Sequence, residues 1–139
     1  MAAPASFVID CSVSVAWLIE TQADAYTEAA LDALTASYAV APQWWNIEVL
    51  NVLLSLQRRG KLAASKSVEL LRYLQRLPIR VHQSQSSTFE LHALALRHQL
   101  SSYDALYLDT ALAIGLPLAT RDKALQQAAI ESGVGVWGA

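Results

Sequence analysis

The stretch Phe7-Val8-Ile9-Asp10-Cys11-Ser12 joins three apolar residues to a carboxylate and begins the regular part of the chain. A short apolar run of this kind is typical of a buried strand, and the polar residues after it indicate a turn into a helix. A carboxylate beside such apolar sequence is costly unless it is paired, caps a helix or binds a metal ion. We therefore expect Asp10 either to cap the following helix, which contributes about 1 kcal/mol to stability, or to belong to a functional site.

Short apolar runs alternate with longer helical patterns along the rest of the sequence. Pro42, Gly60 and Gly115 end the elements that precede them. Strands that alternate with helices predict a mostly parallel sheet covered on both faces. Because no linker or repeat interrupts the pattern, residues 1–139 are expected to form a single domain. The expected strands are residues 6–10, 38–41, 79–82 and 116–120; the expected helices are 13–21, 24–36, 43–59, 64–76, 87–99, 102–114 and 122–132, followed by a last segment at 134–137.

The composition excludes several classes of protein. Hydrophobic residues make up 54% of the chain and charged residues 16%, so it is neither disordered nor highly solvated. No segment approaches the roughly 18 apolar residues of a membrane helix, and the first six residues lack the basic start of a secretory signal. The single cysteine, Cys11, excludes an internal disulfide and suits a cytoplasmic protein. The apolar surplus indicates either a subunit or partner interface or an Ala- and Leu-rich monomer core.

The basic residues are unevenly distributed. The net charge is −2, yet residues 1–57 contain six acidic residues and no Lys or Arg, and all ten basic residues lie between Arg58 and Lys123. Cations at Arg58, Arg59, Arg121 and Lys123 would suit the backbone of a nucleic acid around an acidic metal centre. A cluster such as Arg58 and Arg59 is also typical of a solvated helix terminus.

Two further acidic residues lie in helical patterns that are otherwise strongly apolar. Glu48 shares a narrow polar stripe with Asn51 and Ser55, and this stripe faces either a functional partner or solvent. Asp104 follows Ser101 by three residues, which resembles a capping box at a helix start. Such a cap is compatible with metal binding, because a helix N-terminus favours the ionised carboxylate that a metal requires.

The fourth acidic residue, Asp122, follows the last apolar run through Thr120 and Arg121. Asp122 could be an ordinary N-cap, and the Thr120 hydroxyl could position a carboxylate or a water, or cap the same turn. Ligands of parallel sheets lie at the carboxyl ends of the strands, so we expect the four acidic residues to converge there. Two carboxylates about 4 Å apart repel by roughly 4 kcal/mol at an effective dielectric of 20, so a convergent set requires a cation.

The chemistry of these side chains predicts the kind of ion. Ligation by oxygen alone favours Mg²⁺ or Mn²⁺ over zinc. His92 and His98 are six residues apart, which does not align them on one helix face, and His82 lies on an expected strand. Asp109 falls about 140° round a regular helix from Asp104, so it is expected to point elsewhere, and its role stays open.

Four stretches of the chain, which contain these acidic residues, resemble the motifs of PIN-domain proteins. The resemblance runs through essentially the whole chain, with the motifs in the same order, and is strongest to the single-domain VapC-type toxins of toxin–antitoxin pairs. It implies an α/β fold, namely a three-layer α/β/α sandwich around a central, mostly parallel sheet. The stretches are Phe7-Val8-Ile9-Asp10-Cys11-Ser12, Glu48-x-x-Asn51, Tyr103-Asp104-Ala105-Leu106-Tyr107 and Ala119-Thr120-Arg121-Asp122-Lys123-Ala124-Leu125.

The resemblance also implies an activity and a set of site residues. It implies a Mg²⁺- or Mn²⁺-dependent ribonuclease, in which Asp10 and Asp104 are the firmest metal ligands and Glu48 and Asp122 complete the acidic site. Thr120 matches the family's hydroxyl position, Asn51 is the companion of the helix glutamate, and Ser12 is a supporting residue. The RNA backbone would be held by Arg58, Arg59, Arg121 and Lys123. The family commonly forms homodimers, and an antitoxin protein inhibits its toxins by placing its tail in the pocket.

Two alternatives remain open from the residues. A receiver-like phosphoacceptor domain is also α/β, but it requires paired acids after the first strand, where Asp10 stands alone, and an isolated lysine after a late strand, where Lys123 adjoins an acid. A catalytically silent PIN-like module that serves only in assembly would suit the apolar surplus, although it gives no reason for four acids at these positions. Incubation with RNA in Mn²⁺ or EDTA separates the three hypotheses.

Overall fold

The computed structural model describes residues 6–138 and is built around a four-stranded parallel sheet. The strands are β1 (Phe7–Ile9), β2 (Ala39–Pro42), β3 (Ile79–His82) and β4 (Leu118–Ala119). Their order is β3-β2-β1-β4, so the chain runs outward from β1 to β3 and then returns to place β4 on the other side of β1. The strand order therefore reverses at β1, where an open α/β sheet forms its ligand crevice.

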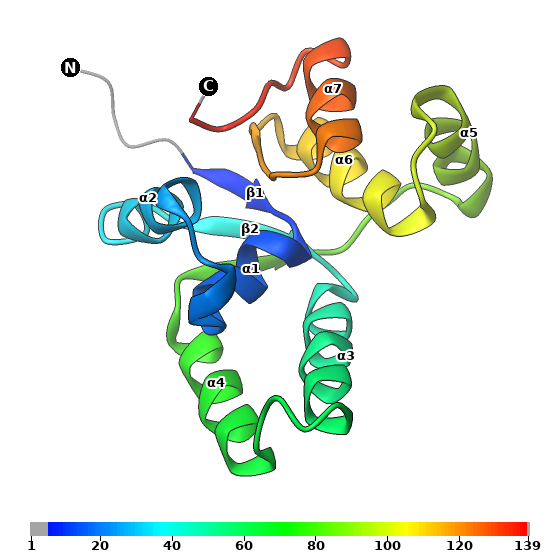
Figure 1. Cartoon of the computed structure of the whole chain (residues 1–139). Helices are drawn as coiled ribbons and strands as arrows, with labels where there is room; N and C mark the ends of the chain where they lie inside the picture. The colour runs from blue at the N-terminus through cyan, green and yellow to red at the C-terminus, as the bar shows by residue number, and fades with distance from the viewer. Residues whose placement is uncertain (1–5, 139) are drawn as a thin grey trace.

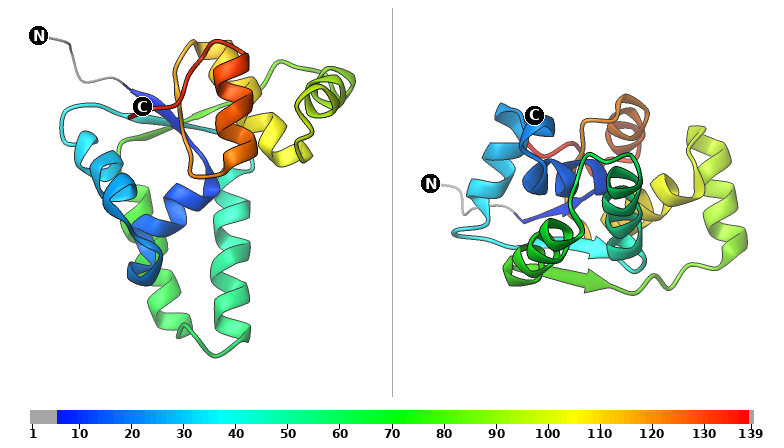
Figure 2. Two further views of the ribbon diagram at one scale, coloured as in Figure 1. Left: turned by 45° about the horizontal axis from the view of Figure 1, so that its top comes forward. Right: turned by 60° about the horizontal axis from the view of Figure 1, so that its bottom comes forward.

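Helices flank this sheet and produce the predicted three-layer α/β/α arrangement (Figure 1). Helix α6 packs against β1, β2 and β4, while α1 packs against α2 and α3. Figure 1 and the left view of Figure 2 show α3 and α4 as an arm that extends away from the sheet, and α5 beside α6. The helices are α1 (Cys11–Leu18), the 3₁₀ turn η1 (Glu20–Gln22), α2 (Ala25–Ala33), α3 (Trp45–Arg58), α4 (Ala64–Arg76), α5 (Thr88–His98), α6 (Ser102–Ile114) and α7 (Lys123–Glu131).

Each expected strand and helix is present, but several predicted boundaries are wrong by one to three residues, among them the end of α2, which lies at Ala33 rather than at residue 36. The first helix begins at Cys11 rather than at residue 13, because the Asp10 side chain accepts a hydrogen bond from the Val13 amide and caps the helix. The last strand covers only Leu118–Ala119 instead of residues 116–120. The expected final segment contributes an isolated parallel bridge between Val136 and Leu118.

Three of the four tryptophans are held by contacts inside the fold. The indole N–H of Trp17 donates to the Thr27 carbonyl oxygen, and that of Trp45 donates to the Ser14 hydroxyl, both at 2.8 Å. The Trp137 ring packs on Phe7 with 4.9 Å between ring centroids. Trp44 differs from these, because 62% of its surface is exposed. The apolar surplus of the sequence is thus divided between the core and the surface.

The residues of β1 are completely buried, as a strand covered on both faces requires. They form part of one core that includes residues of β2, β4, α1, α3, α6 and α7. None of the helices within residues 6–138 has the length and apolar character needed to span a bilayer.

Candidate active site

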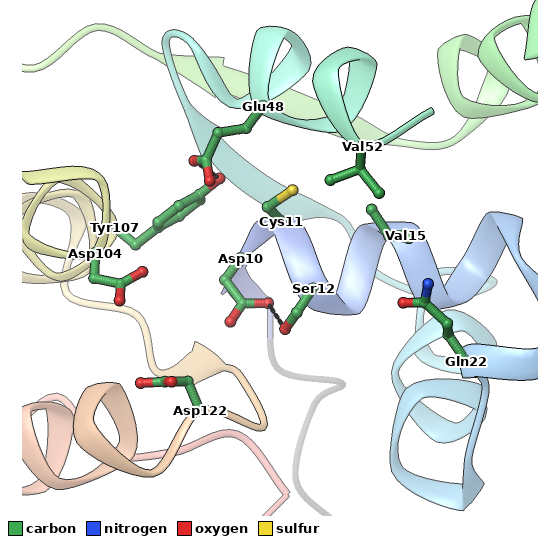
Figure 3. A pocket seen from close by; sticks show the side chains of 10 residues that line it. All are labelled: Asp10, Cys11, Ser12, Val15, Gln22, Glu48, Val52, Asp104, Tyr107 and Asp122. Carbon is green, nitrogen blue, oxygen red and sulfur yellow. Dashed lines mark hydrogen bonds between the residues drawn. The ribbon is translucent and has the colours of Figure 1, made fainter. Parts of the chain in front are cut away.

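A pocket of about 330 Å³ lies next to the carboxyl ends of β1 and β4 and is lined by all four acidic residues singled out above. Figure 3 shows Asp10, Glu48, Asp104 and Asp122 around this pocket, on four different segments of the chain. Strand order brings the first and last of them together, because β1 and β4 are neighbours in the sheet. The remaining lining residues are Cys11, Ser12, Val15, Gln22, Val52 and Tyr107.

Asp10 is both a helix cap and a wall of the pocket, so the two interpretations of this residue are compatible. Its Oδ1 accepts hydrogen bonds from the Ser12 hydroxyl and the Val13 amide, both at 2.9 Å. Its Oδ2 accepts a hydrogen bond from the Thr120 hydroxyl at 2.5 Å. Burial raises the pKa of Asp10, since only 5% of the residue is exposed, while these donors and the charge of Arg121 act in the opposite direction.

Thr120 connects two of the acidic residues through one hydroxyl group. Besides donating to Asp10, the completely buried Thr120 Oγ1 accepts a hydrogen bond from the Asp122 amide at 3.0 Å. Asp122 in turn caps α7, because its Oδ2 accepts from the Leu125 amide at 2.9 Å. The Thr120 hydroxyl therefore ties the end of β1 to the start of α7 and sets the spacing of this side of the pocket.

Glu48 is directed into the pocket by a residue that sequence reasoning did not assign a role. The hydroxyl of Tyr107 donates to Glu48 Oε1 at 2.9 Å, across 59 positions of sequence. Burial, followed by the charge of Glu48, raises the pKa of Tyr107 well above its ordinary value, so the hydroxyl keeps its proton and remains a donor. Tyr107 follows Asp104 by three residues, and this spacing on one helix face was the signal available in the sequence.

Asp104 lies half-buried in the first turn of α6. Its amide donates to the hydroxyl of the N-cap residue Ser101 at 3.1 Å, which is one of the two bonds of the predicted capping box. Burial raises the pKa of Asp104, and the charges of Asp122 and Asp10 raise it further. The pKa of Glu48 is likewise raised, first by burial and then, against the Tyr107 hydrogen bond, by the charges of Asp104 and Asp10. The carboxylates therefore repel one another, and the pocket attracts positive charge.

Comparison with known proteins identifies the fold family. The family model of the PIN domain matches residues 7–131 of this chain. The chain belongs to the PIN-domain family. This confirms the resemblance predicted from the ordered motifs.

Two kinds of relative support this PIN-domain assignment. Ribonuclease VapC3 of Mycobacterium tuberculosis, in both the CDC 1551 / Oshkosh and the ATCC 25618 / H37Rv strains, is 33% identical over 125 residues, which cover 90% of this chain and 88% of the relative. The crystal structure of PAE2754 from Pyrobaculum aerophilum superposes with a TM-score of 0.70 at 19% identity and covers 96% of each chain. The second similarity concerns the fold alone and agrees with the three-layer arrangement.

The acidic pocket of this PIN domain fits a hard divalent cation by the chemistry of its donors. Its four acidic side chains offer only oxygen, and none of the lining residues is a lysine or an arginine. Within residues 6–138, no three His, Cys, Asp or Glu side chains form a ready-made metal cluster. Mg²⁺ does not require one, because it keeps several waters and is usually bound through one or two carboxylates. The roles of the four acids as ligands stay a prediction.

The predicted supporting residues of the PIN domain lie in three different settings. Ser12 lines the pocket and donates to Asp10. Asn51 is exposed and lines a neighbouring hollow together with Glu48. The Arg121 guanidinium donates to the Gln22 carbonyl oxygen at 2.8 Å and pairs with Asp24 at 3.1 Å.

The other basic residues lie further from the acids or at the surface. Arg58 ends α3, ten residues after Glu48, which at 1.5 Å per residue places the two backbones about 15 Å apart along the helix axis. Arg59 follows directly, and both arginines are exposed. Lys123 is exposed at the first position of α7, next to Asp122. Contact of these side chains with RNA stays a prediction.

Asp109 has a structural role outside the acidic pocket. Its carboxylate accepts hydrogen bonds from the Ser84 hydroxyl at 2.7 Å and from the Ser86 hydroxyl at 2.5 Å. These bonds attach the segment between β3 and α5 to α6. Asp109 therefore provides a comparison for the four acidic residues of the pocket, as a partly buried acid that lies outside it.

Proposed function

We propose that this protein is a Mg²⁺- or Mn²⁺-dependent ribonuclease and the toxin of a type II toxin–antitoxin pair. The observation that carries the proposal is that four carboxylates from four separate segments line one pocket of a PIN domain. The similarity to a relative named Ribonuclease VapC3 supports both the activity and the toxin role.

The acidic residues of the pocket would share the binding of the metal ion, and Glu48 would have a second part in the proposed reaction. Asp10 and Asp104, with Glu48 and Asp122, would hold Mg²⁺ or Mn²⁺, which supplies a more acidic bound water and neutralises charge on the phosphate. Glu48, oriented by the Tyr107 hydroxyl, would orient the attacking water or accept its proton. These groups would hydrolyse a phosphodiester bond of RNA.

Thr120 and the basic residues would position the metal ligands and the RNA, and would take no direct part in breaking the phosphodiester bond. The Thr120 hydroxyl keeps Asp10 and Asp122 at a set spacing, and so fixes the geometry of the oxygen donors. Arg58, Arg59, Arg121 and Lys123 would contact the RNA backbone, which aligns the strand without reading its sequence. The Arg121 guanidinium contacts the pocket wall, since it donates to the Ser12 carbonyl oxygen at 3.5 Å.

The proposed partners follow from the same relatives. We expect a cytoplasmic homodimer that is inhibited by a cognate antitoxin protein. Large apolar side chains remain exposed on α5, where Phe89 is 86% and Leu96 is 67% accessible, and these suit a protein interface. This observation also suits the alternative of a silent PIN-like module that serves only in assembly. The receiver-like alternative has no support, because the family is the PIN domain.

Cleavage of RNA by purified variants tests the proposal. Wild type is expected to cleave RNA in Mn²⁺ and to be inactive in EDTA, whereas Asp10→Asn and Asp104→Asn lose cleavage in Mn²⁺ and keep the circular dichroism spectrum of wild type. Asp109→Asn is the matched control, since this acid lies outside the pocket, and it is expected to retain activity. Unchanged cleavage by either pocket variant would refute the assignment, and a wild type that is inactive with Mn²⁺ would favour the silent module.

A further inference from the structure

A second hollow, of about 540 Å³, adjoins the acidic pocket and shares part of its wall. Glu48 and Val52 of α3 line both, and Figure 3 shows these two side chains on the α3 side of the acidic pocket. We call the second site the aromatic hollow, because two exposed aromatic residues belong to it. Its lining residues are Trp44, Ile47, Glu48, Asn51, Val52 and Tyr103. A molecule bound at the carboxylates can therefore extend directly into the aromatic hollow.

Trp44 is held there in an unfavourable backbone conformation. Its φ angle is +76°, in the left-handed region that a bulky side chain rarely adopts and that costs roughly 1 kcal/mol or more. The next residue, Trp45, is buried and donates to the Ser14 hydroxyl, so its indole stabilises the core. The Trp44 side chain is 62% exposed and belongs to the wall of the hollow. A strained backbone that presents an exposed indole beside an acidic site indicates a binding role rather than a packing role.

Tyr103 and Asn51 complete the chemical character of the aromatic hollow. Tyr103 directly precedes Asp104 in α6 and is 55% exposed, so an aromatic ring lies next in sequence to a predicted metal ligand. Asn51 is exposed one turn of α3 beyond Glu48 and offers both a donor and an acceptor. Flat aromatic faces together with an amide are the groups with which proteins bind unstacked bases of RNA.

We propose that the aromatic hollow is a nucleobase subsite, in which an unpaired base of the RNA stacks on Trp44 and Tyr103 and its edge contacts Asn51. The inference rests on the proposed ribonuclease function and deepens it, because it places the base beside the phosphodiester held at the acidic pocket. The substrate is then a single-stranded segment, since the bases of a double helix are stacked inside it and their faces are not available. The lining contains no cation, and its one charged residue, Glu48, would repel a phosphate, so the hollow suits a base rather than a phosphate.

Binding of RNA without cleavage tests the subsite directly. A fluorescein-labelled single-stranded RNA of about 12 nucleotides is titrated with each variant in EDTA at physiological salt and followed by fluorescence anisotropy. Trp44→Ala and Tyr103→Ala are each expected to weaken binding about 5- to 100-fold, the usual effect of losing one base–aromatic stack. Trp44→Phe keeps an aromatic face and is expected to bind close to wild type. Phe89→Ala, which removes an exposed aromatic that lines neither hollow, is the matched control and leaves binding unchanged.

A second measurement combines a change in the protein with a change in the RNA. Once the cleaved bond is mapped, an RNA that lacks the base beside that bond is cleaved in Mn²⁺ by wild type and by Trp44→Ala. Wild type is expected to cleave this abasic RNA about 5- to 100-fold more slowly than the intact RNA, whereas the penalty is smaller for Trp44→Ala, in which only Tyr103 and Asn51 still contact the base. An equal penalty for the missing base in both proteins overturns the proposal, because Trp44 and the base would then act independently.

The outcomes separate this inference from the proposed activity. If wild type does not cleave RNA but binds it in a Trp44-dependent way, the ribonuclease proposal fails and the base subsite stands. If wild type cleaves RNA and Trp44→Ala binds and cleaves like wild type, the subsite is refuted and the ribonuclease stands. Sedimentation of both proteins is measured in parallel. A wild-type dimer that becomes monomeric in Trp44→Ala, with RNA binding unchanged, assigns the aromatic hollow to a protein interface and overturns the subsite.

Discussion

Replacement of Thr120 by valine is the sharpest test of how the acidic pocket is built. Valine has the same branched shape but lacks the hydroxyl, which donates to Asp10 Oδ2 at 2.5 Å and accepts from the Asp122 amide at 3.0 Å. Thr120 is completely buried, so water cannot replace either bond without opening the structure. The substitution therefore removes two contacts and leaves the surrounding core in place.

The size of the effect follows from the nature of the two bonds. A hydrogen bond to a charged group contributes about 1.5–3 kcal/mol, and the bond from the Asp122 amide contributes about 0.5–1.5 kcal/mol. Thr120→Val is thus expected to lower the free energy of unfolding by about 2–4 kcal/mol, or roughly 6–15 °C in melting temperature for a chain of this size. The Thr120 hydroxyl lowers the pKa of Asp10, because it stabilises the ionised form. Since the lost bond favours the charged carboxylate, the deficit should shrink as pH falls and Asp10 takes up a proton.

Denaturant unfolding in EDTA measures this loss, and isothermal titration with Mn²⁺ measures its consequence for the pocket. We expect the affinity for Mn²⁺ to fall about 10- to 100-fold, because the hydroxyl orients two of the predicted ligands. Thr110→Val is the matched control: Thr110 is also completely buried, but its hydroxyl donates only to the Leu106 carbonyl oxygen of its own helix. This control should cost about 0.5–1 kcal/mol. If both variants unfold at the same denaturant concentration and bind Mn²⁺ alike, Thr120 does not organise the site.

Three further variants test other contacts of the site. Tyr107→Phe removes the donor to Glu48 and is expected to lower the rate of Mn²⁺-dependent cleavage about 10- to 100-fold without unfolding the protein; equal rates would show that this bond is dispensable. Burial and acidic neighbours raise the pKa of Asp104 in the folded protein above its value in the unfolded chain. In EDTA the protonated side chain therefore contributes fully to the free energy of unfolding below about pH 4, and this contribution is lost as the pH rises through the raised pKa. Asp104→Asn should therefore melt at a higher temperature than wild type in EDTA, by a margin that grows from about pH 4 to about pH 7, and a margin independent of pH would contradict this. Asp109→Ala releases the two serines of the β3–α5 segment and should lower the free energy of unfolding by about 1–3 kcal/mol in denaturant titration, with cleavage retained; loss of cleavage in a folded protein would contradict its structural role.

Local pattern was sufficient to predict most of the architecture. The buried run before Asp10 and the alternation of strands with helices predicted a parallel sheet between helices, because hydrophobic periodicity reports which faces are covered. The exact ends of the helices and strands could not be predicted as well from this pattern. Asp10 begins α1 two residues earlier than the apolar pattern does, since its side chain caps the helix through the Val13 amide.

Several features of the pocket could not be predicted from the hydrophobic pattern of the sequence. The pattern did not show whether the polar stripe that contains Glu48 faces solvent or the protein, and it assigned no role to Tyr107, although the spacing from Asp104 was visible. The two neighbouring tryptophans differ in this respect: Trp45 falls on the apolar face of the expected helix, whereas the pattern gave no place to Trp44. One is buried and bonded to Ser14 and the other is exposed, because the turn before α3 forces them to opposite environments.

What the chain alone determined is the kind of element at each place and the positions of carboxylates at strand ends and helix starts. These depend on interactions between residues close in sequence, and an apolar run followed by an acid carries that information by itself. What only the tertiary structure decided is which groups meet: Thr120 reaches Asp10 across 110 positions, and Tyr107 reaches Glu48 across 59. Those meetings follow from the strand order β3-β2-β1-β4, which places the last strand beside the first. Long-range pairing of strands is set by the packing of the whole core, so no local segment contains it.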